Sequence, residues 1–432
     1  MGGGISRRIH RQSLAIGAFT TVLAVAACGS TSLHQPGSST SARLAPSPIP
    51  LITPTPTPVP TPTPAPLPCA PPTPQGGPEL IDDLSMFSPT TGWAEEAGTS
   101  TILRTTSGAQ RWAVASPPLS GDQQVLAVSF LDAGSAQAIT GTLWNCDNQG
   151  PPSADLVAWS TQDGGATWSS EGTFSVPRFD GGTLDFVDLE DGWLSVLEGA
   201  GLGSSGMAVY RTVDGGTQWS EVAETSFEGS STPGAAGVIP FSDDKNGAVF
   251  IDPTTGWITG GTAGVTPVFF VTHDGGVTWN SQALPPSASF SQPETEPPHF
   301  WSSQGGWLQG SLVYLTTDGG AEWTPVSLPS GQLPEAVDFI DASDGWLLTF
   351  TETSAGVQTS QTLWSTQDGG GAWTAISSDT ALLFPDFVNA DDGWATTTAG
   401  SGAAVPALLQ TTNGGRTWTA VSPEFTGSAP SS

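Results

Sequence analysis

Short hydrophobic segments, four to six residues long and separated by Gly, Pro, Asp and Ser, recur through residues 79–425. Each unit of this pattern contains an aliphatic-Asp-Phe run, a Gly-Trp run, an apolar run that ends in Thr, and a Trp-x-x-Val run. Segments of this length, bounded by turn-forming residues, are typical of β-strands. The pattern therefore predicts an all-β region in which every unit supplies four short strands.

A six-residue motif, Asp-Gly-Gly-x-x-Trp, separates the third and fourth predicted strands, and we call it the box. Its glycines can adopt a positive φ without steric cost, and an Asp or Asn oxygen can cap the backbone N–H groups of a turn. We interpret the box as a structural hairpin turn whose tryptophan folds back over the strands. The first and last residues of the six boxes are Asp163 and Trp168, Asp214 and Trp219, Asp274 and Trp279, Asp318 and Trp323, Asp368 and Trp373, and Asn413 and Trp418. An altered copy, Ser107 to Trp112, precedes them.

A second motif pairs a hydrophobic dipeptide with a Gly-Trp a few residues later, upstream of the boxes. Together the two motifs account for 13 of the 17 tryptophans, so they describe how the chain is built and are not scattered sites. The second unit has only a worn copy, Val128 to Ala136, without the tryptophan. The Gly-Trp pairs are Gly92-Trp93, Gly192-Trp193, Gly256-Trp257, Gly306-Trp307, Gly345-Trp346 and Gly393-Trp394.

Seven such units predict a seven-bladed β-propeller of four-stranded antiparallel blades. A lone four-stranded unit cannot bury both of its faces, whereas sheets stacked round a closed circle bury one another. An open β-solenoid is the alternative, but units of about 50 residues are too long for one solenoid coil. The ring could close with complete blades or with an exchanged edge strand, and the sequence leaves both open.

The first thirty residues predict an export signal. Residues 1–13 contain three arginines and no acid, and residues 14–27 form an apolar stretch that is too short to span a bilayer. The sequence Val-Ala-Ala-Cys-Gly at the end of this stretch looks like a bacterial lipobox. We therefore expect residues 1–27 to be a lipoprotein signal peptide and Cys28 to carry a lipid that anchors the chain outside the cell membrane. A plain secretory signal with an incidental cysteine is the alternative.

A linker, residues 28–78, follows the expected lipidation site. It is rich in Ser, Thr and Pro, with 15 prolines from residue 45 onward, and this composition predicts a disordered, extended stalk. The propeller is expected to fill residues 79–425, with residues 426–432 as a tail. Cys69 and Cys146 could form one disulfide in an oxidising compartment, although neither their spacing nor their context fixes this pairing.

Charge excludes nucleic acid as a partner. Residue 79 onward holds all 40 acidic residues and only 6 basic ones, a net charge of −34, so no basic stripe can displace phosphate counterions. This charge favours a basic protein partner or a cationic ligand, or simply keeps a Trp-rich surface soluble. The cysteines and histidines show no metal-ligand spacing, and no cofactor is expected.

The box is similar to the Asp-box (BNR) repeat of sialidases, sortilin-type receptors and some glucanases. Its combination with the upstream Phe and Gly-Trp, seven times over, more closely resembles the photosystem II assembly/stability factor family. The resemblance covers residues 79–425 and implies a seven-bladed propeller, often secreted or lipid-anchored in bacteria. Photosynthetic members are associated with a basic patch that engages the reaction-centre chain. An equivalent patch here would have to come from Arg104, Arg111, Arg178, Arg211, Lys245 and Arg416.

The sequence contains few candidate catalytic residues. A sialidase needs three converging arginines and a tyrosine nucleophile, and only Tyr210 and Tyr314 are available. Carboxylate pairs such as Glu95 with Glu96 or Asp185 with Asp188 are explained more simply as solvated strand edges and turns. The runs Asp243-Asp244 and Asp341 to Asp344 could hold Ca²⁺, but neither forms a full loop of alternating oxygen ligands.

We therefore expect a membrane-anchored, extracytoplasmic and monomeric propeller that binds or scaffolds an envelope protein or a glycan and is not an enzyme. The alternative is a carbohydrate-active Asp-box protein, either glycosidase-like or glycan-binding. Any specific contact surface is expected in the longest segments between boxes, residues 221–250 and 281–300.

Overall fold

A computed structural model of the chain divides into two units, residues 1–13 with 67–432 and residues 14–66. All residues that the structure describes belong to the first unit. They are residue 68 and residues 81–96, 99, 101–144, 151–201, 204–225, 234–240, 243–261, 268–285, 295–310, 312–353, 358–378, 382–397 and 408–426. Within them, no helix is long and apolar enough to cross a membrane. The expected signal peptide, the lipidation site Cys28, the stalk, Cys69 and Cys146 all lie outside the described residues.

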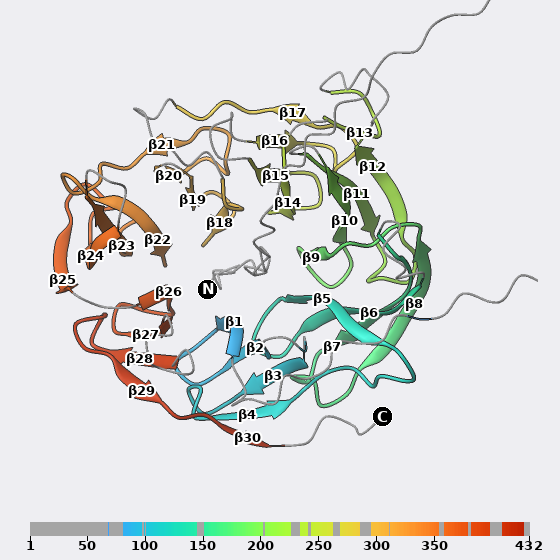
Figure 1. The fold of residues 1–432 in the computed structure, drawn as a ribbon, viewed down its shortest axis with the longest axis horizontal. Coiled ribbons are helices and arrows are strands. Elements are labelled where there is room, and N and C mark those ends of the chain that lie inside the picture. Colours follow the sequence, from blue (N-terminus) through green and yellow to red (C-terminus); the bar gives the residue numbers. More distant parts are fainter. Residues whose placement is uncertain are drawn as a thin grey trace, which may run out of the picture. The chain divides into compact units, whose positions relative to one another are not determined.

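Seven antiparallel sheets follow one another round a ring, and the first strand of each sheet lies nearest the ring centre (Figure 1). The first blade contains β1 (Ile81–Met86), β2 (Gly92–Glu96), β3 (Thr101–Thr105) and β4 (Arg111–Val114), and the second contains β5 (Gln124–Phe130), β6 (Ala136–Trp144), β7 (Ser153–Thr161) and β8 (Ser169–Val176). The third contains β9 (Gly182–Phe186), β10 (Gly192–Gly201), β11 (Ser204–Thr212) and β12 (Ser220–Thr225), to which β13 (Val238–Ile239) adds a parallel edge strand.

The other four blades contain four strands each. The fourth blade contains β14 (Lys245–Phe250), β15 (Gly256–Gly260), β16 (Val268–Thr272) and β17 (Asn280–Ser281), and the fifth contains β18 (His299–Phe300), β19 (Gly306–Gln309), β20 (Val313–Thr316) and β21 (Thr324–Pro325). The sixth contains β22 (Leu333–Phe339), β23 (Gly345–Glu352), β24 (Gln358–Thr366) and β25 (Thr374–Ser378), and the seventh contains β26 (Leu382–Phe387), β27 (Asp392–Thr397), β28 (Leu408–Thr412) and β29 (Thr419–Val421). The predicted seven-bladed propeller of four-stranded blades is confirmed.

The ring closes with complete blades and one additional outer strand. After the seventh blade, β30 (Glu424–Thr426) pairs in parallel with β4 of the first blade, and Phe425 packs against the core there. Near the ring centre, the backbone N–H of Met86 donates to the Asp386 carboxylate of the seventh blade at 3.3 Å. The structure thus decides between the two closures that the sequence left open.

The glycine of a Gly-Trp pair lets a large side chain of the inner strand, an aromatic ring in five of the six pairs, pack closely against it. A Cβ added to Gly192 would lie 2.5 Å from the Phe186 ring of the neighbouring strand, closer than real Cβ atoms approach. Glycines 256, 306, 345 and 393 face the ring of their own inner strand in the same way, and Gly92 faces Met86. This close packing is the physical reason for the spacing between the hydrophobic dipeptide and Gly-Trp.

The inner-strand phenylalanines of the fourth and seventh blades are each held between two tryptophans. The Phe250 ring stacks on Trp193 of the preceding blade, with ring centroids 3.7 Å apart, and meets the edge of its own box tryptophan, Trp279, at 6.1 Å. Trp346, Phe387 and Trp418 repeat this arrangement. Such aromatic pairs stabilise a core beyond the area that they bury, so the two tryptophan motifs together join neighbouring blades.

An aspartate on the inner strand also links one blade to the next. The Asp185 carboxylate accepts a hydrogen bond from the backbone N–H of Phe250 at 2.6 Å, and Asp338 accepts from Phe387 at 2.7 Å. Asp185 is only 7% exposed. The Asp of the aliphatic-Asp-Phe run therefore fixes the position of the neighbouring inner strand.

Candidate functional site

The box side chains close their own turns. The Asp163 carboxylate accepts hydrogen bonds from the backbone N–H of Thr167 at 2.9 Å and from its hydroxyl at 2.6 Å, while the Thr161 hydroxyl donates from the other side at 2.9 Å. These bonds, that from the Thr167 hydroxyl first, lower the pKa of Asp163. The same pattern recurs at Asp214, Asp274, Asp318, Asp368 and Asn413.

The altered first box keeps this geometry with other residues. Ser107 replaces the aspartate, and its hydroxyl accepts a hydrogen bond from the backbone N–H of Arg111 at 2.9 Å. Ala109 replaces the second glycine and has a φ of 66°, a left-handed conformation that L-residues rarely adopt. The turn is therefore fixed by the backbone shape and the capping oxygen more than by the identity of each residue.

The box tryptophans pack in the core. Trp112, Trp279 and Trp323 are no more than 4% exposed. The partly exposed Trp168 and Trp373 each donate their indole N–H to a backbone carbonyl, of Ala115 and Ser327 respectively. Trp219 and Trp418 meet an inner-strand phenylalanine edge to face. In this arrangement the box residues act as a turn and a core anchor.

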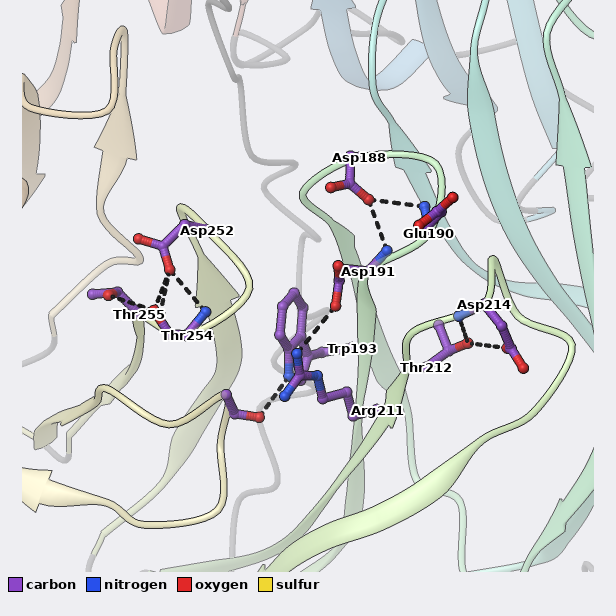
Figure 2. A network of polar contacts seen from close by, with 11 residues as sticks. Asp188, Glu190, Asp191, Trp193, Arg211, Thr212, Asp214, Asp252, Thr254 and Thr255 are labelled. Carbon is purple, nitrogen blue, oxygen red and sulfur yellow. Dashed lines mark hydrogen bonds and ion pairs between the residues drawn. The ribbon is translucent and has the colours of Figure 1, made fainter.

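Where two blades meet, the Gly-Trp strand of one blade faces two turns of the next, and we call this place a corner. At the corner between the third and fourth blades, the Trp193 indole N–H donates to the carbonyl of Gly275 in the next box at 2.9 Å. The Arg211 guanidinium lies 5.1 Å from the Trp193 ring centroid and bonds to Asp191 at 3.0 Å (Figure 2). An indole and a guanidinium of this chain thus fill the corner.

The corner between the first and second blades is filled in the same way. Arg104 lies 4.8 Å above the Trp93 ring, donates to the carbonyl of Gly92 at 2.9 Å, and also donates to the carbonyl of Ala133 in the second blade. Burial lowers the pKa of Arg104, and the nearby Asp132 opposes this effect. In both corners the arginine stands directly opposite the tryptophan in the strand register.

The corner between the second and third blades lacks both groups. In the register that pairs Trp193 with Arg211, the second blade pairs Gln137 with Ser160. A cleft of about 430 Å³ lies here, and its walls include Gln137, Ser160 and Gly215. Gly215 is the first glycine of the third-blade box, which corresponds to the Gly275 that accepts the Trp193 indole in the next corner. The cleft therefore lies where the two neighbouring corners each hold an indole and a guanidinium.

Two exposed aliphatic side chains line the same cleft. Leu189 is 40% exposed and Val213 is 60% exposed, and with Phe384 they are the exposed large hydrophobic residues among the described part of the chain. At the position of Leu189 the other six blades have Pro, Ala or Ser, and at that of Val213 they have Thr, Gln or His. The sequence shows that the second unit lacks Gly-Trp, but no local pattern links this gap to these two residues of the third unit.

The tyrosines considered as nucleophiles are buried. Tyr210 is 7% exposed and donates its hydroxyl hydrogen bond to Glu221 at 3.1 Å, and burial, with Glu221 adding to it, raises the pKa of Tyr210. Tyr314 is 2% exposed and donates to the carbonyl of Pro285. Both side chains belong to the hydrophobic core between blades.

Two of the aspartates considered for catalysis or Ca²⁺, Asp188 and Asp341, cap turns of the fold. Asp188 caps its turn by accepting the backbone N–H groups of Glu190 and Asp191, each at 2.8 Å, and Asp252 caps the equivalent turn of the fourth blade (Figure 2). Asp341 does the same for Ser343 and Asp344. Among the described residues, no group of three or more His, Cys, Asp or Glu side chains is placed to hold a metal ion.

The basic residues of the propeller are spread over separate places. Arg104 and Arg211 fill two corners, and Lys245 is 2% exposed, with its ammonium group bonded to the carbonyl of Ser205 at 3.0 Å. Burial lowers the pKa of Lys245 to about 8, although Asp244 and Asp243 oppose this shift. The exposed cations of the described residues are Arg111, Arg178, which lies 3.9 Å from Glu198, and Arg416.

Comparison with known proteins relates part of the chain to one family. Residues 238–403 match the family described as photosynthesis system II assembly factor YCF48. The chain is 28% identical over 158 residues to the photosystem II assembly lipoprotein Ycf48 of Synechococcus sp. (strain CC9902). This match spans 35% of the chain and 43% of that protein, less than half of either. The resemblance to this family that the motifs predicted is confirmed.

Solved structures with a similar fold include both binding proteins and enzymes. A YCF48 bound to a D1 peptide is 16% identical, with a TM-score of 0.44, over 78% of this chain and 93% of that one. The GH74 xyloglucanase from Xanthomonas campestris is also 16% identical, with a TM-score of 0.38, over 80% of this chain and 45% of that one.

Proposed function

We propose that this chain is a non-catalytic, protein-binding propeller that assists the assembly of a membrane protein complex outside the cytoplasm. The observation that carries the proposal is the match of residues 238–403 to a family of photosystem II assembly factors, together with the similarity to an assembly lipoprotein. The geometry is consistent with it, because Asp185, Asp188 and Tyr210, which were considered for catalysis, are held in a turn or in the core.

The proposal includes a lipid anchor on Cys28 and a stalk over residues 28–78, which would hold the propeller away from the membrane surface. The support for it is the sequence pattern of residues 1–29 and the word lipoprotein in the name of the similar Synechococcus protein. Mass spectrometry of the mature N-terminus would show a lipidated Cys28, and a Cys28→Ala variant would appear in the soluble fraction. An unmodified N-terminus downstream of Cys28 would contradict the anchor.

The partner is expected to be a protein of the cell envelope. Crosslinking of the full chain in the native envelope, followed by pull-down, should recover one membrane protein complex at a specific stage of its assembly. A tagged variant with Cys28→Ala serves as a control, because it keeps the propeller but loses the expected anchor. Recovery of no envelope protein with either form would count against the binding function, and recovery with the wild type alone would show that binding depends on the anchor.

Catalysis is tested separately with chromogenic glycosides and natural glycans. The proposal predicts no turnover. Turnover that a single carboxylate substitution abolishes would instead establish a glycosidase.

A further inference from the structure

The cleft between the second and third blades lies at a position where the two neighbouring corners hold a tryptophan and an arginine side chain. In the two neighbouring corners, the residue of the Gly-Trp strand and the residue opposite it in the next strand are Trp93 with Arg104 and Trp193 with Arg211. In the second blade these residues are Gln137 and Ser160, both much shorter. The cleft lies at these shorter side chains, and Leu189 and Val213 of the third blade also line it.

The turn that receives a guanidinium elsewhere is also present at the cleft. Arg104 donates to the carbonyl of Ala133, which lies in the turn between the first two strands of the next blade. At the cleft, the residue of the corresponding turn is Leu189, and its carbonyl oxygen would lie 2.9 Å from a Cβ built on Gly215. The equivalent oxygen of Pro253 would also lie 2.9 Å from a Cβ built on Gly275, where Arg211 fills the corner. An acceptor oxygen thus occupies the same place in both corners.

Three carboxylates lie at the cleft, and no basic side chain lines it. They belong to Glu171, Glu190 and Asp214, and among the described residues none of them pairs with a Lys or Arg. Glu171 accepts a hydrogen bond from the Ser160 hydroxyl at 2.6 Å, and Asp214 is engaged with its own turn. Figure 2 shows Glu190 and Asp214 on neighbouring turns of the third blade, away from the corner that Arg211 fills.

A buried amide adds an observation that does not depend on these acids. Gln137 is 2% exposed and lines the cleft, yet its side chain makes no hydrogen bond within the described part of the chain. The amide is not one of the fully enclosed unpaired polar atoms of the described residues, so its small exposed area is open to a hydrogen-bond partner from outside the chain. The wall opposite is aliphatic, formed by Leu189 and Val213.

We propose that this cleft binds an arginine side chain of a partner protein, and this inference rests on the protein-binding function proposed above. The methylene stem would pack on Leu189 and Val213, and the guanidinium would take the place that Arg104 and Arg211 take in the neighbouring corners. Its N–H groups would reach the carboxylates of Glu171 and Glu190 and the carbonyl of Leu189. A planar fork of donors fits several oxygens at once, which a lysine ammonium group does not do.

The chain itself provides few arginines for this cleft. Its exposed cations among the described residues are Arg111, Arg178 and Arg416, against the carboxylates that give the region from residue 79 onward a charge of −34. Two copies would therefore repel each other at most orientations, whereas a basic segment of another protein would be attracted. The partner chemistry is accordingly a basic, arginine-bearing peptide segment.

The test is a titration of the full chain, labelled on its Leu and Val methyl groups, followed by NMR. The probes are three blocked tripeptides, acetyl-Gly-X-Gly-amide, in which X is arginine, lysine or citrulline, the neutral isostere of arginine. The arginine peptide should shift the Leu189 and Val213 methyl signals in a saturable way. The lysine peptide should bind about tenfold more weakly, and citrulline should give no saturable shift. Equal binding of arginine and lysine would overturn the proposal, as would shifts spread evenly over the surface.

Two variants and a control make the test specific to the cleft. Ser160→Arg places a guanidinium of the chain itself in the cleft, opposite Gln137 as Arg211 is opposite Trp193, and should abolish peptide binding without unfolding the protein. Glu190→Gln should weaken binding about tenfold. Glu322→Gln removes an exposed carboxylate from the fifth blade and should leave binding unchanged. If Ser160→Arg leaves the methyl shifts of the arginine peptide intact, the cleft is not the site.

The outcome separates this inference from the proposed function. If an envelope partner is recovered equally well with wild-type chain and with Ser160→Arg, the binding function stands and the arginine site is refuted. If the arginine peptide binds the cleft but no partner is recovered, the site stands and the assembly role is refuted. If two copies associate through the cleft, ultracentrifugation will show a dimer that Ser160→Arg dissociates, and the partner assignment is refuted.

Discussion

Two corners of the ring, one on each side of the third blade, have the same strand register but hold different side chains. On one side Trp193 and Arg211 fill the space against the fourth blade, with the indole N–H on the carbonyl of Gly275 and the guanidinium on Asp191. On the other side Gln137 and Ser160 of the second blade leave a cleft against the third blade. The difference shows that the blade-to-blade geometry does not require the indole at every corner. One corner can therefore lack the indole and be open to a ligand, while the contacts between the other blades keep the ring closed.

The filled corner should dominate stability. Trp193 is fully buried, stacks on Phe250 at 3.7 Å and donates to Gly275, so Trp193→Ala should lower the free energy of unfolding by about 3–5 kcal/mol. Urea titration followed by circular dichroism measures this loss. The matched change in the open corner, Gln137→Ala, removes a smaller side chain without a hydrogen bond and should cost about 1 kcal/mol. Equal losses of the free energy of unfolding at the two corners would show that Gln137 is packed as tightly in its corner as Trp193 is.

The strand beneath the filled corner should tolerate no added methyl group. In Gly192→Ala the new Cβ would lie 2.5 Å from the Phe186 ring, and relief of this overlap should cost about 1–3 kcal/mol in the free energy of unfolding. The control is Gly134→Ala in the second blade, where the nearest atoms are 3.5 Å from the added Cβ and the backbone is not in the left-handed region. The control should unfold at the same urea concentration as the wild type. A large loss in the control would mean that added bulk at any of these turns is harmful.

The repeat predicted the ring but not the meaning of its irregular copy. The spacing of the boxes and Gly-Trp pairs was sufficient for seven blades, because each unit carries its own turn and its own core anchors. By itself, the worn copy at Val128 to Ala136 indicates only a departure from the repeat. Its consequence becomes visible only when Gln137 is aligned with Trp193, Ser160 with Arg211, and the two exposed residues Leu189 and Val213 are placed across the gap.

Other features depend on contacts between blades that no local pattern reveals. Lys245 follows two aspartates and precedes an asparagine, which is typical of an exposed loop, yet the structure buries it against the third blade. The contact surface expected in residues 221–250 and 281–300 stays a prediction, since parts of both segments lie outside the described residues. The cleft lies elsewhere, in residues 137–215.

Restoring the missing indole should make the open corner resemble the filled one. In Gln137→Trp the new ring would stack on Phe186, as Trp193 stacks on Phe250, and its N–H would face Gly215. An added aromatic pair of this kind contributes about 0.5–1.5 kcal/mol, so the thermal midpoint should rise by about 1–5 °C in differential scanning calorimetry. The same variant should lose binding of the arginine peptide. A lower midpoint would mean that the cleft has closed around Gln137 and has no room for the indole.

The smallest expected effect is on the pH dependence of stability. It concerns Lys245, which with Arg211 is the second cation between the third and fourth blades. The pKa of Lys245 is lowered to about 8 in the folded chain, whereas an unfolded lysine keeps its proton up to about pH 10.4. Between these values the unfolded state binds more protons, so the free energy of unfolding should rise with pH, by at most about 1.4 kcal/mol per pH unit. Lys245→Met should flatten this rise between pH 8 and 10, as measured by urea titration at each pH. Arg178→Gln removes an exposed cation and should keep the wild-type slope. An unchanged slope in Lys245→Met would show that this lysine is as well solvated in the folded chain as in the unfolded one.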